Sequence, residues 1–244
     1  MTKSGRFLEI FREIERILKR LNGSSRRATA GQALKELLKK RREDEGAGAL
    51  ISVVRHFADD LQALVDLRNA IVHNTEGLLG EPTDKAIELA EKILHHLKNP
   101  PTVQKFVSRG IYFVEGRDPL GKVLEAMYEK EYSQVPVLDS GQLKDLLTTN
   151  TIARWLAVQA KQGKVEAEGV QVKDVLKFRE ESEKWEVISQ GTNLFEVLEC
   201  FVKFRTLVAL VITQNGQKTE KPIGIVTPWD LTEIYRELEI QRPR

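Results

Sequence analysis

Apolar positions in the first hundred residues recur at helical spacing, so that one side of each segment is apolar and the other is charged. Residues 4–22 show the pattern most clearly, with apolar side chains three or four positions apart at Phe7, Ile10, Phe11, Ile14, Ile17, Leu18 and Leu21. Similar stripes run over residues 30–42, over residues 49–73 and after Glu81-Pro82. Four amphipathic helices with short links predict an up-and-down bundle, the all-α part of an α+β chain.

The pattern changes at Asn99-Pro100-Pro101. Proline lacks the backbone N–H that a helix needs, so two prolines after a lysine-ended helix are a strong stop signal. Beyond them, short apolar runs bounded by glycine-containing turns predict buried strands. The sequence therefore predicts a helical domain over residues 1–99 and a second domain over residues 100–244.

The second half contains an internal repeat. The segments DPLGKVLEAM and TNLFEVLECF share four residues at an offset of 74 positions: Leu120, Val123, Leu124 and Glu125 against Leu194, Val197, Leu198 and Glu199. A buried-strand run follows each segment, QVPVLD at 134–139 and VALVIT at 208–213. A glycine turn, a second strand and a helix come next in both copies. The repeat predicts two β-α-β-β-α units that pack face to face.

This repeat resembles a tandem pair of cystathionine-β-synthase (CBS) domains, with copies at about 102–165 and 170–240. In the segment GIVTPWDL the Thr-x-x-Asp motif of that family falls on Thr227 and Asp230. The resemblance implies that the hydroxyl and the helix start bind a phosphate while the aspartate accepts hydrogen bonds from ribose. Free backbone N–H groups at the positive end of a helix are suited to a phosphate.

The first copy departs from the motif. Thr148 occupies the threonine position, but Thr151 stands where the aspartate belongs, and Asp145 replaces the glycine supplied by Gly224. A hydroxyl is a weaker ribose partner than a carboxylate, since charge-assisted hydrogen bonds are stronger. We therefore expect the second site to be the better one.

The resemblance also implies where the adenine of AMP, ADP or ATP lies. The base would meet backbone and apolar groups near Ile188 and Ala209 at the second site, and near Val135 at the first. Two alternatives stay open. Thr227 and Asp230 also fit an ordinary helix N-terminus, and some CBS pairs bind nothing and only pack against neighbours.

The helical half has one sharp motif, DLRNAIVHN, which resembles the Arg-x4-6-His motif of HEPN (higher eukaryotes and prokaryotes nucleotide-binding) domains. Arg68, Asn69 and His73 match its arginine, following polar residue and histidine. The resemblance implies a metal-independent endoribonuclease that dimerises to bring two motifs together. Arginine can hold a phosphate and histidine can act as base or acid near neutral pH. The alternative is structural, with Arg68 inside the apolar stripe and paired with Glu9 or Glu13.

Charge and composition narrow these hypotheses only a little. Residues 1–42 carry 13 Lys/Arg against 4 Asp/Glu. The basic runs Arg26-Arg27 and Lys39-Lys40-Arg41-Arg42 within them could track an RNA backbone, although solvated helix faces commonly look the same. The single cysteine excludes an intrachain disulfide and fits a cytoplasmic protein. No Cys/His cluster has zinc spacing, no metal is expected, and no apolar run is long enough to cross a membrane.

Together the two halves predict a homodimeric regulatory protein. The CBS pair would sense an adenine nucleotide and control the HEPN-like domain. The first hypothesis is a nucleotide-regulated endoribonuclease. The alternative is a non-enzymatic sensor whose helical domain binds a partner protein or RNA.

Overall fold

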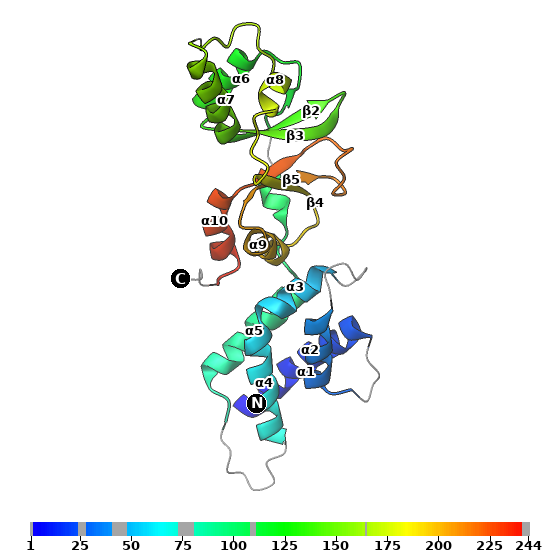
Figure 1. Cartoon of the computed structure of the whole chain (residues 1–244). Helices are drawn as coiled ribbons and strands as arrows, with labels where there is room; N and C mark the ends of the chain where they lie inside the picture. The colour runs from blue at the N-terminus through cyan, green and yellow to red at the C-terminus, as the bar shows by residue number, and fades with distance from the viewer. Residues whose placement is uncertain are drawn as a thin grey trace. The chain divides into compact units, whose positions relative to one another are not determined.

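The computed structural model describes residues 2–23, 28–40, 48–72, 81–107, 111–163 and 165–240. The chain divides into two compact units (Figure 1), Met1–Pro101 with Asn193–Glu196, and Thr102–Thr192 with Val197–Arg244. The described part is helical in the first unit and contains two three-stranded mixed sheets in the second. This arrangement confirms the predicted α+β class, a helical region followed by a CBS-like pair.

The first unit is built from amphipathic helices whose apolar faces pack together. Threonine hydroxyls cap three of these helices by accepting from a backbone N–H in the first turn, at Thr2, Thr29 and Thr83. The longest helix, α1, packs against α2 and α5. The helices are α1 (Lys3–Asn22), α2 (Ala30–Lys39), α3 (Gly48–His56), α4 (Ala58–Val72) and α5 (Asp84–Lys98).

The long third helix predicted over residues 49–73 is wrong, because the chain turns at Phe57 between α3 and α4. The Phe57 ring is buried, and its centroid lies 5.7 Å from that of Phe195 and 5.8 Å from that of His96. Asp59 and Asp60 then lie in the first turn of α4, where a carboxylate favours the helix dipole. The packing of the Phe57 ring and the start of α4, with Asp59 and Asp60 in its first turn, together explain why the chain turns at Phe57, although the apolar spacing of residues 49–73 continues through it.

The second unit repeats one arrangement of strands. The central strand of each sheet pairs in parallel with the first strand and antiparallel with the third, in the orders β1-β2-β3 and β4-β5-β6. The first copy holds the 3₁₀ turn η1 (Val103–Phe106), β1 (Val114–Glu115), α6 (Leu120–Glu129), β2 (Gln134–Asp139), β3 (Gln142–Thr148) and α7 (Thr149–Lys161). The second holds α8 (Val172–Leu176), β4 (Lys184–Ser189), α9 (Leu194–Lys203), β5 (Leu207–Thr213), β6 (Gly224–Val226), the 3₁₀ turn η2 (Pro228–Asp230) and α10 (Leu231–Glu237).

The two sheets pack on each other through a small apolar core. Buried side chains of both sheets meet there, at Leu138, Leu143, Leu146, Ala209 and Val211. A second core joins the first sheet to α6, α7 and α8, which lie on its other side (Figure 1). The stacked sheets therefore bring equivalent loops of the two copies to the same part of the unit.

Gly224 lets the chain before β1 approach β6 closely. A Cβ atom at this position would lie 2.5 Å from the backbone oxygen of Phe106 and 3.0 Å from the Cα of Val107. The first copy has Asp145 here, and its carboxylate accepts a 3.1 Å hydrogen bond from the indole N–H of Trp185. The backbone at Phe106 and Val107 therefore packs against β6 at Gly224, whereas the indole of Trp185 contacts β3 at Asp145.

Candidate ligand-binding site

Thr227 and Asp230 form a reciprocal pair at the end of β6. The backbone N–H of Thr227 donates to Oδ2 of Asp230 at 2.6 Å, and its hydroxyl donates to the same oxygen at 3.0 Å. Both residues are half-buried. The chain continues as the short turn η2 before α10, so the motif starts on a 3₁₀ turn instead of directly on an α-helix.

A hollow of about 660 Å³ lies beside this pair. Residues from both copies line it, and the segment that precedes β2 faces the end of β6 across it. The apolar residues that line it include Phe106, Ile225 and Trp229. Trp229 is 83% exposed. The lining residues are Lys105, Phe106, Glu131, Tyr132, Ser133, Gln134, Ile225, Thr227, Trp229 and Asp230.

Lys105 supplies a positive charge to this hollow. Its ammonium lies 2.8 Å from a carboxylate oxygen of Glu237 and 3.3 Å from one of Glu233. Burial lowers the pKa of Lys105, but hydrogen bonds and attraction to Glu237 and Glu233 outweigh burial and raise this pKa above its ordinary value. The side chain is therefore charged at neutral pH and held at the rim by α10.

The residues predicted to contact adenine have little exposed side chain. Val135 and Ala209 are fully buried in the two cores of the unit, and Ile188 is 8% exposed. None of the three is among the residues that line the hollows beside the two motifs. Because these side chains are buried, only the backbone groups near Val135, Ile188 and Ala209 remain candidates for contact with a base.

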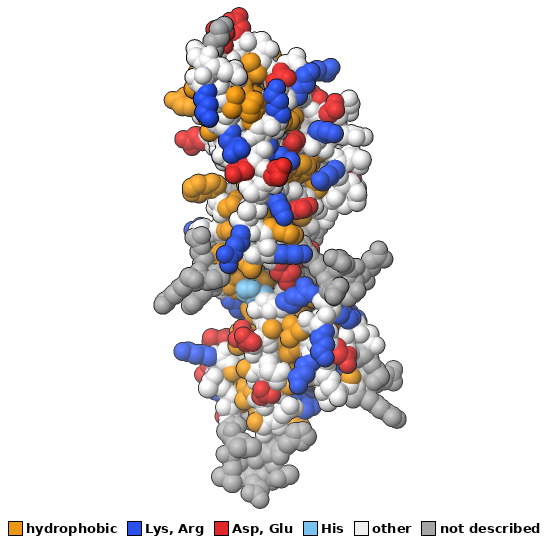
Figure 2. All heavy atoms as spheres, in the orientation of Figure 1, with side chains coloured by type: hydrophobic (Ala, Val, Ile, Leu, Met, Phe, Trp, Pro, Cys, Tyr) orange, Lys and Arg blue, Asp and Glu red, His pale blue; other side chains and the backbone are white. Residues whose placement is uncertain are grey.

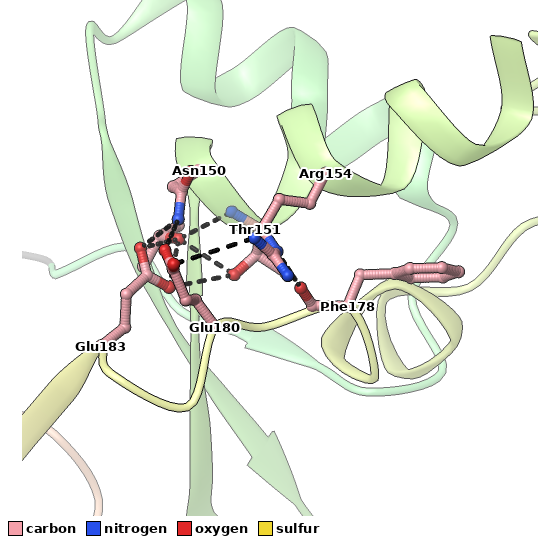
Figure 3. Close-up of polar contacts among 7 residues, drawn as sticks. Asn150, Thr151, Arg154, Phe178, Glu180 and Glu183 are labelled. Atoms are coloured by element: carbon pink, nitrogen blue, oxygen red, sulfur yellow. Dashed lines mark hydrogen bonds and ion pairs between the residues drawn. The ribbon is translucent and has the colours of Figure 1, made fainter. Parts of the chain in front are cut away.

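The matching place in the first copy is differently filled. Thr148 caps α7 by accepting a 3.0 Å hydrogen bond from the backbone N–H of Thr151, and both threonines are buried. The carboxylate of Glu183, from the loop before β4, reaches both hydroxyls. Figure 3 shows this carboxylate pointing at the start of the helix. Sequence reasoning missed Glu183, because nothing near it in the chain marks its partners.

A smaller hollow of about 290 Å³ lies by Glu183. It shares Gln134 and Trp229 with the larger one and adds the exposed Arg205. These two hollows are neighbours, and the one beside Thr227 and Asp230 is the larger of the pair. A separate hollow of about 670 Å³ in the same unit is lined by residues that include Gly116, Ser140 and Lys177.

The helical unit has a separate hollow of about 500 Å³, lined in part by Lys19, Arg68 and Asn69. Arg68 is half-buried, and its Nη1 donates a 3.1 Å hydrogen bond to the amide oxygen of Asn69. The suggested partner Glu13 instead pairs with Lys98. No ion pair of Arg68 with Glu13 or Glu9 occurs in the described part of the chain, which corrects the structural alternative. His73 lies outside the described residues.

The sequence predicts no metal site and no membrane-spanning helix, and the structure is informative on both points for the described residues only. Among them, no three or more His, Cys, Asp and Glu side chains gather where they could hold a metal ion. Within the same ranges, no helix combines the length and apolar character needed to cross a membrane.

Figure 2 shows basic and acidic side chains intermixed over the visible face of the second unit. The four arginines predicted to follow RNA, at residues 26, 27, 41 and 42, lie outside the described ranges.

Comparisons with known proteins identify the second unit. The family model for the CBS domain matches residues 103–158 and 172–237. No curated protein matches the chain.

Several solved structures are similar to part of the chain. The CBS domain of a CBS domain-containing membrane protein from Sphaerobacter thermophilus is 16% identical, with 62% of this chain and 97% of that chain covered and a TM-score of 0.44. A CBS domain-containing protein of unknown function from Kribbella flavida is 16% identical, with 55% of this chain and 97% of that chain covered and a TM-score of 0.44. A protein named CBSX2, solved in complex with AMP, is 20% identical, with coverages of 57% and 98% and a TM-score of 0.42. The family match, and not these distant structures, identifies the unit.

Proposed function

Because the chain belongs to the CBS domain family through its tandem pair, we propose that the second unit senses an adenine nucleotide in the hollow beside Thr227 and Asp230. The observation that carries this proposal is a carboxylate and a hydroxyl at the wall of an open hollow that also holds a lysine and an exposed indole. These are the groups that a ribose, a phosphate and a base require.

Each part of a nucleotide has a suitable partner there. Both hydrogen bonds from Thr227 use Oδ2 of Asp230, so Oδ1 is available to accept from a ribose hydroxyl. Lys105 can attract a phosphate, at the cost of weakening its pairs with Glu233 and Glu237. Phe106, Ile225 and Trp229 provide apolar surface for a base.

The size of the hollow supports the same ligand class. Small-molecule pockets commonly span roughly 300–1,000 Å³, and the hollow measures about 660 Å³. Its walls come from both copies of the repeat, so a ligand there contacts the end of β6 and the segment before β2 together. A ligand that binds one arrangement of the two copies better than another would shift their equilibrium.

Nucleotide titrations followed by calorimetry test the proposal. AMP, ADP, ATP and adenosine are titrated into the wild type and into Asp230→Ala. Glu129→Ala is the control, because this exposed acid on α6 lines none of the three hollows described in the second unit. We expect binding by the wild type and the control and loss of binding in Asp230→Ala. A wild type that binds none of the four ligands would refute the proposal.

The first unit suggests a second function, metal-independent cleavage of RNA. Its hollow holds Arg68 beside the amide of Asn69, together with Lys19, whose ammonium pairs with Glu15 of the same hollow at 2.9 Å. The guanidinium of Arg68 is therefore the group that could hold a phosphodiester there. With the resemblance of Arg68, Asn69 and His73 to the HEPN motif, this favours an endoribonuclease that the CBS pair regulates in a homodimer.

Labelled RNA incubated in chelator tests this second function. Cleavage by the wild type, lost in Arg68→Ala and His73→Ala and retained in Lys35→Ala, would support an enzyme. Lys35 is the control because it is exposed and does not line the hollow. Absence of cleavage under every nucleotide condition would favour the alternative, a helical unit that binds a protein or RNA partner without cutting it.

A further inference from the structure

The carboxylate of Glu183 is held at the start of α7 by several side chains. The hydroxyl of Thr148 lies 3.2 Å from Oε2 and 3.3 Å from Oε1, and the hydroxyl of Thr151 lies 3.4 Å from Oε2. The amide of Asn150 donates to Oε1 at 3.0 Å. Figure 3 shows Asn150 and Thr151 on one side of this cluster and Glu183 on the other. Three side chains of one helix start therefore converge on one carboxylate.

The loop that carries Glu183 is itself anchored. Asn150 also donates to Glu180 at 3.1 Å, and the guanidinium of Arg154 donates to the backbone oxygen of Phe178 at 3.0 Å. A turn bond of 3.0 Å joins the N–H of Glu183 to the oxygen of Glu180. Figure 3 shows Arg154 pointing from the helix toward Phe178. These contacts fix the position of the carboxylate relative to α7.

This position is where the first copy would hold a phosphate. Thr148 ends β3 and caps α7, and Thr227 follows β6 directly and opens the 3₁₀ turn η2. Because α7 has 13 residues, its N-terminus carries the positive end of a full helix dipole. A carboxylate and a phosphate compete for the same hydroxyls and the same field.

The second copy differs in the origin of its carboxylate. Asp230 is part of the motif and lies at the wall of the large hollow, whereas the first copy has the buried Thr151 in that place. Glu183 comes from another element, more than thirty residues further along the chain. The first copy is therefore already occupied by an anion of its own chain.

We infer that Glu183 determines the specificity of the first site by standing in for phosphate, so that this chain takes phosphorylated nucleotides at the second site alone. A phosphate entering beside Glu183 would meet a like charge and would have to displace its hydrogen bonds. The exposed Arg205 lines the same hollow as Glu183 and could attract a phosphate there once the carboxylate is removed. The inference rests on the proposed nucleotide function and specifies its stoichiometry.

Calorimetric titration with AMP tests the inference in four proteins. We expect one AMP per chain for the wild type, two for Glu183→Ala and none for Asp230→Ala. The double variant Asp230→Ala/Glu183→Ala should bind one AMP, because only the opened first site remains. Glu181→Ala is the matched control: it removes an exposed acid from the same loop, outside these contacts, and should leave the stoichiometry at one.

Glu183→Gln keeps the size of the side chain and removes its charge. The double variant Asp230→Ala/Glu183→Gln should bind AMP at least about tenfold more tightly than Asp230→Ala alone. This change is expected because the repulsion between the carboxylate and the phosphate is lost while the packing around position 183 is kept. This variant decides the matter if Glu183→Ala does not fold, as judged by circular dichroism.

The outcomes separate this inference from the proposed function. Two AMP per wild-type chain, or a double variant that binds no more than Asp230→Ala, would overturn the inference while leaving the second site intact. Absence of AMP binding from all variants would overturn both. Recovery of binding in the double variant supports the inference by itself, because the second site is disabled there.

Discussion

Thr227 and Asp230 are joined twice, by a 3.0 Å bond from the hydroxyl and a 2.6 Å bond from the backbone N–H to the same carboxylate oxygen. The aspartate that is proposed to hold ribose therefore also stabilises the turn that follows β6. Any substitution of Asp230 alters both properties, so ligand binding and stability have to be measured separately.

Asp230→Asn should separate the two. The amide oxygen of Asn can accept the same bonds from Thr227, so the free energy of unfolding should change little, whereas Asp230→Ala should lower it by about 0.5–2 kcal/mol. Both variants should lose nucleotide affinity, because both lack the charge offered to ribose. Urea unfolding and calorimetry measure these quantities. Full affinity in Asp230→Asn would show that the charge is not required.

Lys105→Ala should weaken AMP binding more than adenosine binding. Lys105 is the cation assigned to the phosphate, and one lost charge-assisted bond corresponds to about a tenfold loss of affinity. Lys122→Ala is the control, because Lys122 is exposed on α6 and does not line the hollow. Equal losses for AMP and adenosine would place Lys105 outside the phosphate site.

Gly224→Ala should destabilise the second unit. A methyl group there would lie 2.5 Å from the backbone oxygen of Phe106, and backbone cannot yield as a flexible side chain can. Overpacking of this kind costs about 1–3 kcal/mol. Gly121→Ala on α6 is the matched control, since a Cβ there meets nothing within 4 Å and should stabilise by about 0.4–1 kcal/mol. Equal stability of Gly224→Ala and wild type would contradict the close approach.

Glu220 should make stability depend on pH in acid. Its carboxylate accepts from the backbone N–H and the side chain of Asn215 and from the N–H of Gln217, and these bonds lower the pKa of Glu220 to about 2. A carboxyl whose folded pKa is depressed stabilises the fold above its unfolded pKa, near about 4.3. This contribution is lost as pH falls from about 4.3 toward 2.

Wild type and Glu220→Gln therefore should differ in thermal midpoint at pH 7 and approach each other near pH 2. Glu129→Gln is the control, because it removes a single charge from an exposed side chain of α6, far along the chain from Glu220. A difference between wild type and Glu220→Gln that does not shrink in acid would contradict the assigned pKa.

The repeat, the strands and most of the helices followed from sequence because apolar spacing reports which side of an element is buried. The runs at 134–139 and 208–213 became β2 and most of β5 for this reason. The turn at Phe57 did not follow, since its apolar periodicity continues through the break. It depends on aromatic partners, His96 and Phe195, that lie far along the chain.

The candidate site divides in the same way. Thr227 and Asp230 could be proposed from sequence because the family motif is local, and the structure places a hollow beside them. Glu183 could not, because its partners Thr148 and Thr151 lie on another element and a lone glutamate in a charged loop is unremarkable in sequence. Ala209 illustrates the reverse, since a strand residue suited to contact a base is instead enclosed between two sheets.

Trp229 borders the hollow beside Asp230 and the hollow beside Glu183 and is 83% exposed, whereas Trp155 is 3% exposed and Trp185 is fixed by its bond to Asp145. The chain thus carries an intrinsic optical reporter at the wall that these two hollows share. Occupancy of either hollow would remove water from this indole and shift its emission to shorter wavelength. Quenching by a soluble reagent would then fall as the ligand fills the hollow, with the two other tryptophans as a constant background.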